Sequence, residues 1–164
     1  MPDMRDPVVT VWFEEGVLAS MREEADRRTP KETGGVLVGY AAPLSLDFVV
    51  TAMIGPGPRA KHWAFWFLPD TTHQQREAAH LYALSGRTAS YLGDWHTHPG
   101  GSKRLSWLDR TTLRSIARSP GARAPTPIMA VLHGKAPWEL TVWVQVRSRL
   151  LEGRVVDLTK SGHP

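Results

Sequence analysis

The stretch GDWHTHPGGSKRLSWLDR, from Gly93 to Arg110, decides how this sequence is interpreted. His96 and His98 are separated by one residue and run directly into Pro-Gly-Gly. In a strand, alternate side chains point to the same face, so these two imidazoles would lie roughly 6 to 7 Å apart along the chain. That spacing suits two ligands of one metal ion. Asp109 follows where a helix is expected to begin, so its carboxylate could complete the site.

The same stretch also fits an ordinary strand, turn and capped helix. In the pattern S-W-L-D, Ser106 would cap the helix and Asp109 would occupy its third position. The two histidines would then be a polar pair on an exposed strand. Capping and ligation are compatible, because Asp109 could give one oxygen to a metal and the other to the backbone. Two imidazoles and one carboxylate leave a fourth position for water, as in catalytic zinc sites.

The composition limits the alternatives. With 164 residues, of which 41% are hydrophobic and 22% charged, the chain is expected to form one globular domain over residues 1–164, with a core over about 8–147. The absence of cysteine excludes disulfides and thiol nucleophiles, so His, Asp or Glu must hold any metal. The basic residues behind the net charge of +4 are dispersed, and no nucleic-acid partner is expected. Without an apolar span or a signal-peptide core, the expected location is cytoplasmic, with no membrane association.

Hydrophobic periodicity predicts the order of the elements. The expected strands cover residues 8–13, 35–40, 46–54, 62–70, 88–98, 128–132 and 139–146, with a short one after residue 149. The expected helices cover residues 14–28, the segment from the cap Asp70 to Leu84, and residues 106–119. This order predicts an α/β (α+β) fold, a sandwich with a central mixed β-sheet flanked by about three helices. The histidines outside the motif (His62, His73, His80, His133 and His163) are expected on the surface or on helices. Trp95 and Trp107 are expected in the core, with a place in the wall of the cleft as the alternative.

A second segment, PKETGGVLVGY, places Glu32 before Gly35 and Gly39. Alone, ETGG could be a helix-to-strand turn with a solvent-facing glutamate. However, E-x-x-G-x-L-x-G together with HTHP, six residues and SWLD resembles the JAMM motif of the MPN+ metalloproteases. Residues 11–144 resemble the bacterial JAB branch of that family. Because two segments far apart in the chain match in spacing, the metal site is favoured over the ordinary strand and helix.

The resemblance implies an MPN/JAB-type domain with one Zn²⁺ per chain and a catalytic water. By resemblance, His96, His98 and Asp109 would ligate the zinc. Glu32 would be the general base and Ser106 would stabilise the oxyanion. Zinc lowers the pKa of a bound water toward ~7 and polarises a carbonyl, which suits amide hydrolysis without a covalent intermediate.

The resemblance also implies a substrate with a flexible C-terminal tail. The expected activity is a zinc-dependent isopeptidase or peptidase that cleaves after the tail of a ubiquitin-like modifier or a conjugated bacterial protein, with a role in anti-phage defence. Expected partners are activating and conjugating enzymes, or a nucleotidyltransferase of the same operon. Two alternatives stay open: a processing peptidase for a sulfur-carrier or ubiquitin-like precursor, and a catalytically silent MPN-like scaffold.

Substrate contacts are expected in the loops that border the cleft, residues 56–67 and 118–127. Trp63, Phe65 and Phe67 are the candidate substrate-binding residues, and burial in the core is their alternative role. Asp94 lies on the strand face of His96 by alternation. It is expected either to orient an imidazole or to be a polar residue at the rim.

Overall fold

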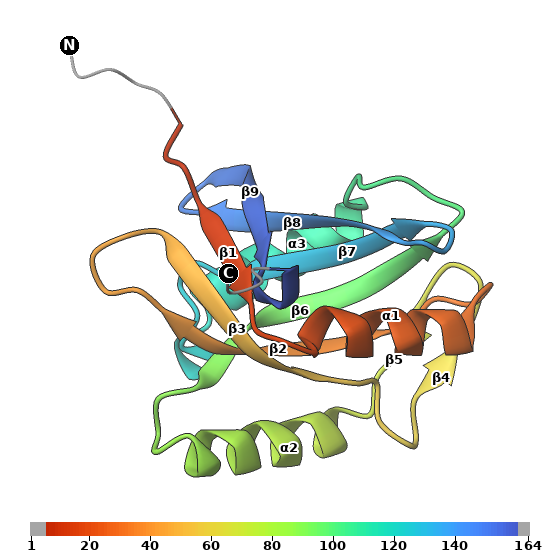
Figure 1. The fold of residues 1–164 in the computed structure, drawn as a ribbon, viewed down its shortest axis with the longest axis horizontal. Coiled ribbons are helices and arrows are strands. Elements are labelled where there is room, and N and C mark those ends of the chain that lie inside the picture. Colours follow the sequence, from red (N-terminus) through yellow and green to blue (C-terminus); the bar gives the residue numbers. More distant parts are fainter. Residues whose placement is uncertain (1–5, 161–164) are drawn as a thin grey trace.

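A computed structural model describes residues 6–160 of the chain, and within them a mixed sheet closes into a barrel (Figure 1). The strands of the barrel are β1 (Thr10–Phe13), β2 (Gly34–Ala41), β3 (Asp47–Ile54), β6 (Ser90–Pro99), β7 (Ile128–Gly134), β8 (Glu139–Val146) and β9 (Arg149–Asp157). They follow one another around the barrel as β1-β3-β2-β6-β7-β8-β9. β1 pairs in parallel with β3 and β9, and β6 with β7, while the other pairs are antiparallel. The predicted mixed sheet is confirmed, and its closure is a feature that the sequence analysis did not anticipate.

The two faces of the sheet are both covered, which explains why β7 is a continuous apolar run. Ile128, Ala130 and Leu132 point inward and join the main core cluster. Met129 and Val131, which alternate with them, belong to a second cluster on the outer face. A strand that is buried on both sides has no polar face to display, so its period-two pattern is hidden in the sequence.

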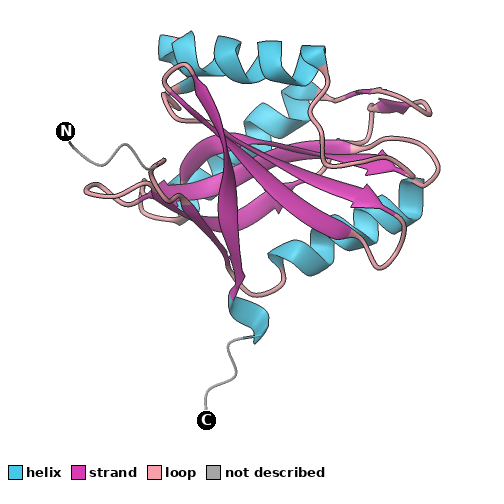
Figure 2. Ribbon diagram, turned by 90° about the horizontal axis from the view of Figure 1, so that it is seen from above, coloured by secondary structure: helices cyan, strands magenta, loops and turns pink. Residues whose placement is uncertain are grey.

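Three α-helices flank this sheet, as predicted (Figure 2). They are α1 (Val17–Arg28), α2 (Thr71–Leu84) and α3 (Trp107–Arg118), with short 3-10 helices at Pro120–Ala122 and Leu158–Lys160. α1 contributes its buried residues to the main core, α2 packs on the outer cluster around Val38, and α3 packs on the outer cluster around Met129 through Leu113. α1 begins at Val17 and not at residue 14, because the Glu14 amide still donates to the Val50 carbonyl of the sheet (3.0 Å).

The aromatic segment 62–70 is not one strand, as the sequence analysis expected. It forms a small separate hairpin of β4 (Lys61–His62) and β5 (Phe67–Leu68), at the right of Figure 1. Trp63 and Trp66 stack at the turn with ring centroids 4.1 Å apart, and the Trp63 amide donates to the Trp66 carbonyl (2.9 Å). The segment therefore folds back on itself: two short strands pair with each other, and the stacked rings lie at the turn between them.

The C-terminal strand is longer than expected. β9 has nine residues, pairs with both β8 and β1, and therefore closes the barrel. The sheet thus extends past residue 147, where the core was expected to end. The alternation in β9 is weak because most of its side chains are only partly buried, so periodicity could not reveal its length.

Several single-residue expectations need correction. His62 lies in β4 and is half-buried, and His133 is buried in β7 against the hydroxyl of Thr141 (3.0 Å), so neither is a surface or helix residue. Trp107 is 78% exposed and does not belong to the core, whereas Trp95 is fully buried as expected. His73 and His80 lie on α2 as expected, and His163 lies outside the described residues.

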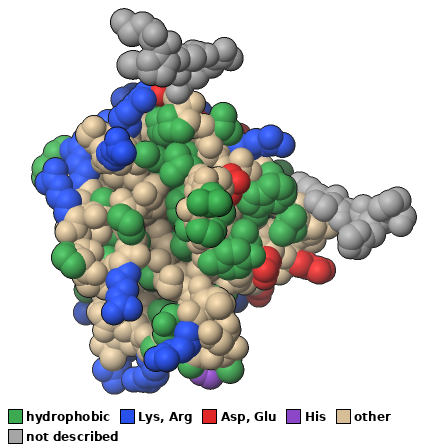
Figure 3. All heavy atoms as spheres, turned by 90° about the vertical axis from the view of Figure 1, so that its left-hand side faces the viewer, with side chains coloured by type: hydrophobic (Ala, Val, Ile, Leu, Met, Phe, Trp, Pro, Cys, Tyr) green, Lys and Arg blue, Asp and Glu red, His purple; other side chains and the backbone are tan. Residues whose placement is uncertain are grey.

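The structure shows two properties, one of the helices and one of the surface charge. Among residues 6–160, no helix is both long enough and apolar enough to cross a membrane. Lys and Arg side chains are spread along the edges of the face in Figure 3 and do not gather in one block. The dispersion of basic residues along the sequence is therefore also seen on this face of the molecule.

Replacing Gly35 by alanine should destabilise the barrel. A Cβ at Gly35 would lie 1.8 Å from the Ile54 carbonyl oxygen and 2.9 Å from Nε1 of Trp95. Because the closest atom belongs to the backbone of β3, the strand itself would have to move. We expect a loss of about 3 kcal/mol, or roughly 10 °C in Tm, measured by thermal unfolding. Gly55→Ala is the control, because its Cβ would have no atom within 4 Å. Equal melting temperatures for the two variants would contradict the close approach.

Candidate metal centre

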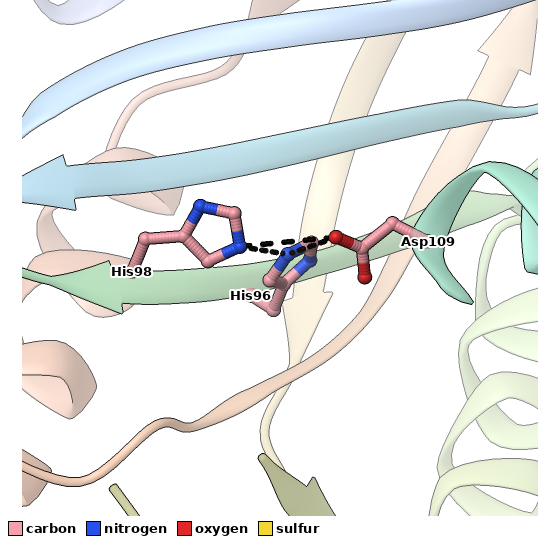
Figure 4. Close-up of side chains that lie close together, drawn as sticks. All are labelled: His96, His98 and Asp109. Atoms are coloured by element: carbon pink, nitrogen blue, oxygen red, sulfur yellow. Dashed lines mark hydrogen bonds and ion pairs between the residues drawn. The ribbon is translucent and has the colours of Figure 1, made fainter. Parts of the chain in front are cut away.

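The three expected metal ligands meet in the structure (Figure 4). Nε2 of His96 lies 2.9 Å from Nε2 of His98. Oδ2 of Asp109 lies 3.6 Å from the first of these nitrogens and 3.8 Å from the second. Tetrahedral zinc with ligands at 2.0–2.1 Å would hold its donor atoms roughly 3.3 Å apart. The observed distances bracket that value, so the three side chains form a group that can hold a metal ion.

The two histidines are brought together by strand alternation. Trp95 and Thr97 are fully buried on one side of β6, so His96 and His98 share the other side. The turn after the strand begins at Gly100, which has a φ of 69° and donates to the Gly134 carbonyl at the end of β7 (2.7 Å). A left-handed residue here is easiest for glycine. The turn directs the chain back across the barrel toward α3, which carries the third ligand.

Asp109 is positioned by the capping box of α3. Its amide donates to Oγ of Ser106 (3.1 Å), and its Oδ2 accepts from the Ser106 amide (2.7 Å). The expectation that separate oxygens would cap the helix and face the metal is wrong, because Oδ2 does both. One carboxylate oxygen has two lone pairs, so the roles are compatible. The capping pattern therefore aims the ligand and does not compete with it.

The protonation of His98 suits a metal ligand. Its Nδ1 lies 2.8 Å from the Ser102 carbonyl oxygen, which can only accept, so Nδ1 carries the proton. The lone pair is then on Nε2, the nitrogen that faces His96 and Asp109. Burial lowers the pKa of His98, and the nearby His96 lowers it further. Both effects favour the neutral imidazole, which is the form that binds a metal.

Asp109 is held in its charged form. Burial alone would raise the pKa of this carboxyl, but the hydrogen bond and positive charge offered by His96 and the hydrogen bonds from Ser106 outweigh that effect. The net result is a pKa well below the usual range. A charged carboxylate is the state that a divalent cation requires.

Glu32 is held beside the ligands by its backbone. Its amide donates to the Trp63 carbonyl (2.8 Å), and its own carbonyl accepts from Nδ1 of His62 (2.9 Å). The next residue, Thr33, exchanges hydrogen bonds with Thr97 of β6: its amide donates to Oγ1 (3.0 Å) and its carbonyl accepts from the Thr97 amide (2.9 Å). The start of β2 is therefore tied to the strand that carries both histidines.

A buried carboxylate of α1 adds a second anchor. Oγ1 of Thr33 donates to Oε1 of Glu24 (2.9 Å), which also accepts from Nε of Arg28 (3.0 Å). Glu24 is only 7% exposed, so removing its partners would leave a buried charge without compensation. Thr33, which directly follows Glu32, is thus fixed to β6 by its backbone and to α1 by its side chain.

Burial raises the pKa of Glu32 from 4.5 to about 7. The neighbouring His96 opposes this shift, and the negative charge of Asp109 adds to it. A carboxyl group with a pKa near the working pH can both accept and return a proton, which is the property of an efficient general base and acid. The geometry and the pKa therefore agree with the role that the motif suggested.

One cleft contains all five motif residues. It has a volume of about 380 Å³, and its polar lining includes the side chains of Glu32, His96, His98, Ser106 and Asp109. Its apolar lining comes mainly from Phe65, Trp66, Phe67, Pro69, Leu108 and Met129. A small polar constellation in a mostly apolar cleft is the usual form of an enzyme site.

The aromatic hairpin forms one wall of this cleft. Phe65 is 89% exposed and Trp63 is 39% exposed, so their alternative role as core residues is wrong. Phe67 is partly buried and lines the cleft, while Trp63 stacks on Trp66 and does not line it. Trp66 also lines the cleft and was not predicted from the sequence, although it lies in the same HWAFWF run. Leu108, which the S-W-L-D pattern contains, lines the cleft as well and was not predicted either.

Two further expectations are settled by contacts. Asp94 does not orient an imidazole: its Oδ1 accepts from the Tyr91 hydroxyl (2.8 Å), and no hydrogen bond among the described residues joins it to a histidine. The segment 118–127 does not line the metal cleft. Its residues Ser119, Gly121 and Ala122 line a neighbouring cavity instead.

Comparison with known proteins points to one family. Residues 14–147 match the family of prokaryotic homologues of the JAB domain. A relative from Sinorhizobium fredii, named probable metalloprotease y4qB, is 40% identical over 91% of this chain and 92% of its own length. A second relative, named CD-NTase/cGAS isopeptidase, from Enterobacter hormaechei, is 29% identical over 76% of this chain and 68% of its own. The solution structure of protein DSY2949 from Desulfitobacterium hafniense has the same fold, with a TM-score of 0.65 at 16% identity, covering 90% of this chain and 92% of that one.

Asp109→Asn should reduce metal binding without unfolding α3. The amide oxygen can still accept from the Ser106 amide, but the negative ligand is lost. We expect wild-type protein, supplied with zinc and then dialysed, to retain about one equivalent by elemental analysis. The variant should retain well under half of that amount at an unchanged helix content. Asp70→Asn, the same change at the cap of α2, should retain full metal. Wild-type protein without metal would show that the three side chains do not form a metal site.

Proposed function

Because the chain belongs to the family of prokaryotic homologues of the JAB domain, we propose that it is a zinc-dependent isopeptidase. Its substrate would be an amide bond at the C-terminal tail of a ubiquitin-like modifier or of another conjugated bacterial protein. The observation that carries this proposal is the placement of Glu32 in one cleft with the His-His-Asp group. The names of the two relatives, a metalloprotease and an isopeptidase, support it.

The residues of this chain can divide the work of amide hydrolysis. Zinc, when bound by His96, His98 and Asp109, supplies a Lewis acid that polarises the scissile carbonyl and lowers the pKa of water. Glu32 accepts the proton of the attacking water and returns it to the leaving amine, and its burial in the cleft raises its pKa and so makes it a stronger base than an exposed glutamate. The hydroxyl of Ser106 is free to donate to the carbonyl oxygen as negative charge develops there, because its oxygen accepts from the Asp109 amide.

This arrangement favours an enzyme over a silent scaffold. A binding scaffold has no need for a histidine whose Nδ1 proton is fixed by a carbonyl so that Nε2 faces a carboxylate. It also has no need for a carboxyl group whose pKa is raised to about 7 beside that group. These properties serve a chemical reaction only if a metal and a substrate occupy the cleft.

The hairpin β4–β5 is the proposed contact for the substrate tail. It is a two-stranded sheet beside the cleft, and an extended peptide can add to such a sheet edge. Trp63, Phe65 and Phe67, with Trp66, would contact the tail or the folded modifier. Exposed aromatic side chains are enriched at such interfaces.

The isopeptidase relative suggests the biological setting that we propose. The conjugated protein would be a nucleotidyltransferase of the same operon, attached by activating and conjugating enzymes in the cytoplasm during anti-phage defence. The enzyme would release that protein by cleaving the isopeptide bond. Cleavage of a linear precursor but not of a conjugate would assign it to the processing peptidases instead.

Glu32→Gln should abolish most activity and leave the metal in place. The amide keeps the shape of the side chain but cannot accept the proton, so the cleavage rate should fall by at least about 100-fold. Zinc content should not change, because no ligand is altered. The rate of the wild type should fall as the pH drops through the pKa of Glu32, which a bound cation lowers from about 7. Cleavage of an isopeptide-linked ubiquitin-like conjugate is the assay. A variant that cleaves at the wild-type rate would show that Glu32 is only a turn residue. A variant that loses zinc would show that Glu32 is a metal ligand.

Phe65→Ala should weaken cleavage of a protein conjugate without affecting the fold. Because Phe65 is 89% exposed, its removal should leave Tm and zinc content unchanged. We expect kcat/KM for the conjugate to fall by at least about five-fold, in the range of moderate interface residues. Leu44→Ala is the matched control, because Leu44 is an apolar side chain that is 100% exposed at the β2–β3 turn. Equal kcat/KM values for the two variants would exclude the hairpin from substrate binding.

A further inference from the structure

A second cavity lies next to the metal cleft, between α2 and α3. It has a volume of about 610 Å³ and shares Pro69, Gln74 and Asp94 with the cleft. The side chains of Gln75 and Ala78 line it from α2, and those of Ser115 and Ile116 line it from α3. The shared lining residues place the two cavities side by side, and we refer to the two together as the path to the metal ligands. An extended peptide that occupied both cavities would lie beside the metal ligands.

Asp94 lies at the junction of the two cavities, on the floor of this path. It is opposite Val36 of β2 and Met129 of β7, so it occupies the middle of the sheet and not an edge. Its Oδ1 accepts from the Tyr91 hydroxyl (2.8 Å), which fixes the carboxylate. No described residue forms a hydrogen bond or an ion pair with its second oxygen, Oδ2. The side chain is therefore a positioned carboxylate with one oxygen left for a ligand.

The lining of the path is acidic although the chain as a whole is basic. The sequence has 20 Lys and Arg residues against 16 Asp and Glu. Among the described residues that line the two cavities, none is Lys or Arg, and the acids are Glu32, Asp94 and Asp109. Asp109 faces the histidines, and Glu32 has the role of proton acceptor in the proposed function. Asp94 has a hydrogen-bond donor in Tyr91 but no positively charged side chain paired with it among the described residues, and burying a carboxylate without a counter-charge is costly.

We propose that Asp94 is a specificity-determining residue that binds a lysine or arginine side chain of the substrate. The inference rests on the proposed peptidase function and names the substrate class for the same cleft. The ligand is an extended peptide that passes the hairpin β4–β5 in the metal cleft and continues between α2 and α3. Its basic residue forms an ion pair with Oδ2 of Asp94 in surroundings that are largely apolar, where such a pair is screened less than at the surface.

The position of Asp94 also sets the place of the basic residue. Asp94 precedes His96 by two residues on the same strand face, which corresponds to roughly 7 Å. An extended peptide advances about 3.3 to 3.6 Å per residue. The basic residue therefore lies about two or three positions from the bond that is cleaved. A basic residue much farther along the peptide would pass beyond this carboxylate.

A peptide-binding experiment tests this inference separately from catalysis. Zinc-loaded Glu32→Gln protein, which should bind without cleaving, is used to select from a pool of random heptapeptides with free C-termini. We expect enrichment of Lys or Arg at one position. A labelled peptide from the selection should bind about 10- to 100-fold more tightly than its Gln-substituted counterpart by fluorescence anisotropy. The added substitution Asp94→Asn should remove that difference, because the amide keeps the Tyr91 hydrogen bond but not the charge.

Three controls separate the outcomes. Glu23→Gln removes an exposed acid of α1 and should leave the preference intact. Asp94→Lys should shift the selection toward acidic residues at the same position. Zinc content should be equal with and without Asp94→Asn. Enrichment that survives Asp94→Asn, absence of any basic preference, or loss of zinc in that variant would each overturn the inference. If conjugates are not cleaved but the preference persists, the proposed function fails while this peptide site stands.

Discussion

The close pairing of β2 with β6 is the constraint on which the rest of the site depends. Gly34 lies opposite His96, and Gly35 lies opposite Trp95. A Cβ at Gly34 would be 2.3 Å from the Trp95 carbonyl oxygen and 2.9 Å from Cα of His96, so only glycine allows the strands to approach this far. The indole of Trp95 then reaches across to donate to the Ile54 carbonyl (3.1 Å), which locks β6 to β3. Because Glu32 comes just before these glycines, the pairing brings its carboxyl group to the cleft that contains the histidines.

Burial shifts the pKa values of different groups in the cleft in opposite directions. Removing a carboxyl group from water disfavours its charged form, which raises the pKa of Glu32 to about 7. The same loss of solvent disfavours the charged form of His98, lowers its pKa and leaves it neutral as a ligand. Asp109 escapes this effect because His96 and the Ser106 amide stabilise its charge. A neutral imidazole, a charged carboxylate and a carboxyl group poised near neutrality therefore coexist in a small volume.

The helices and the small hairpin surround this group with cavity walls and exposed aromatic side chains. α3 supplies a ligand at its first turn and forms one wall of the path to it, while α2 forms the other wall. The hairpin β4–β5 supports Glu32 from its backbone and displays aromatic side chains to solvent. One segment thus connects the backbone of Glu32 to the surface that we propose for substrate contact. A change in the hairpin that alters its turn would affect both.

The sequence by itself identified the three candidate metal ligands and the local elements that bring them together. HTHP and SWLD predicted alternation and capping correctly, because both depend on contacts between residues close in the chain. Only the tertiary structure decided what depends on distant contacts. The closure of the barrel by β9, the fold-back of the HWAFWF run and the burial of His133 all arise from partners elsewhere in the chain. The pKa of Glu32 belongs to the same class, because desolvation comes from the packing around a group and not from its neighbours in sequence.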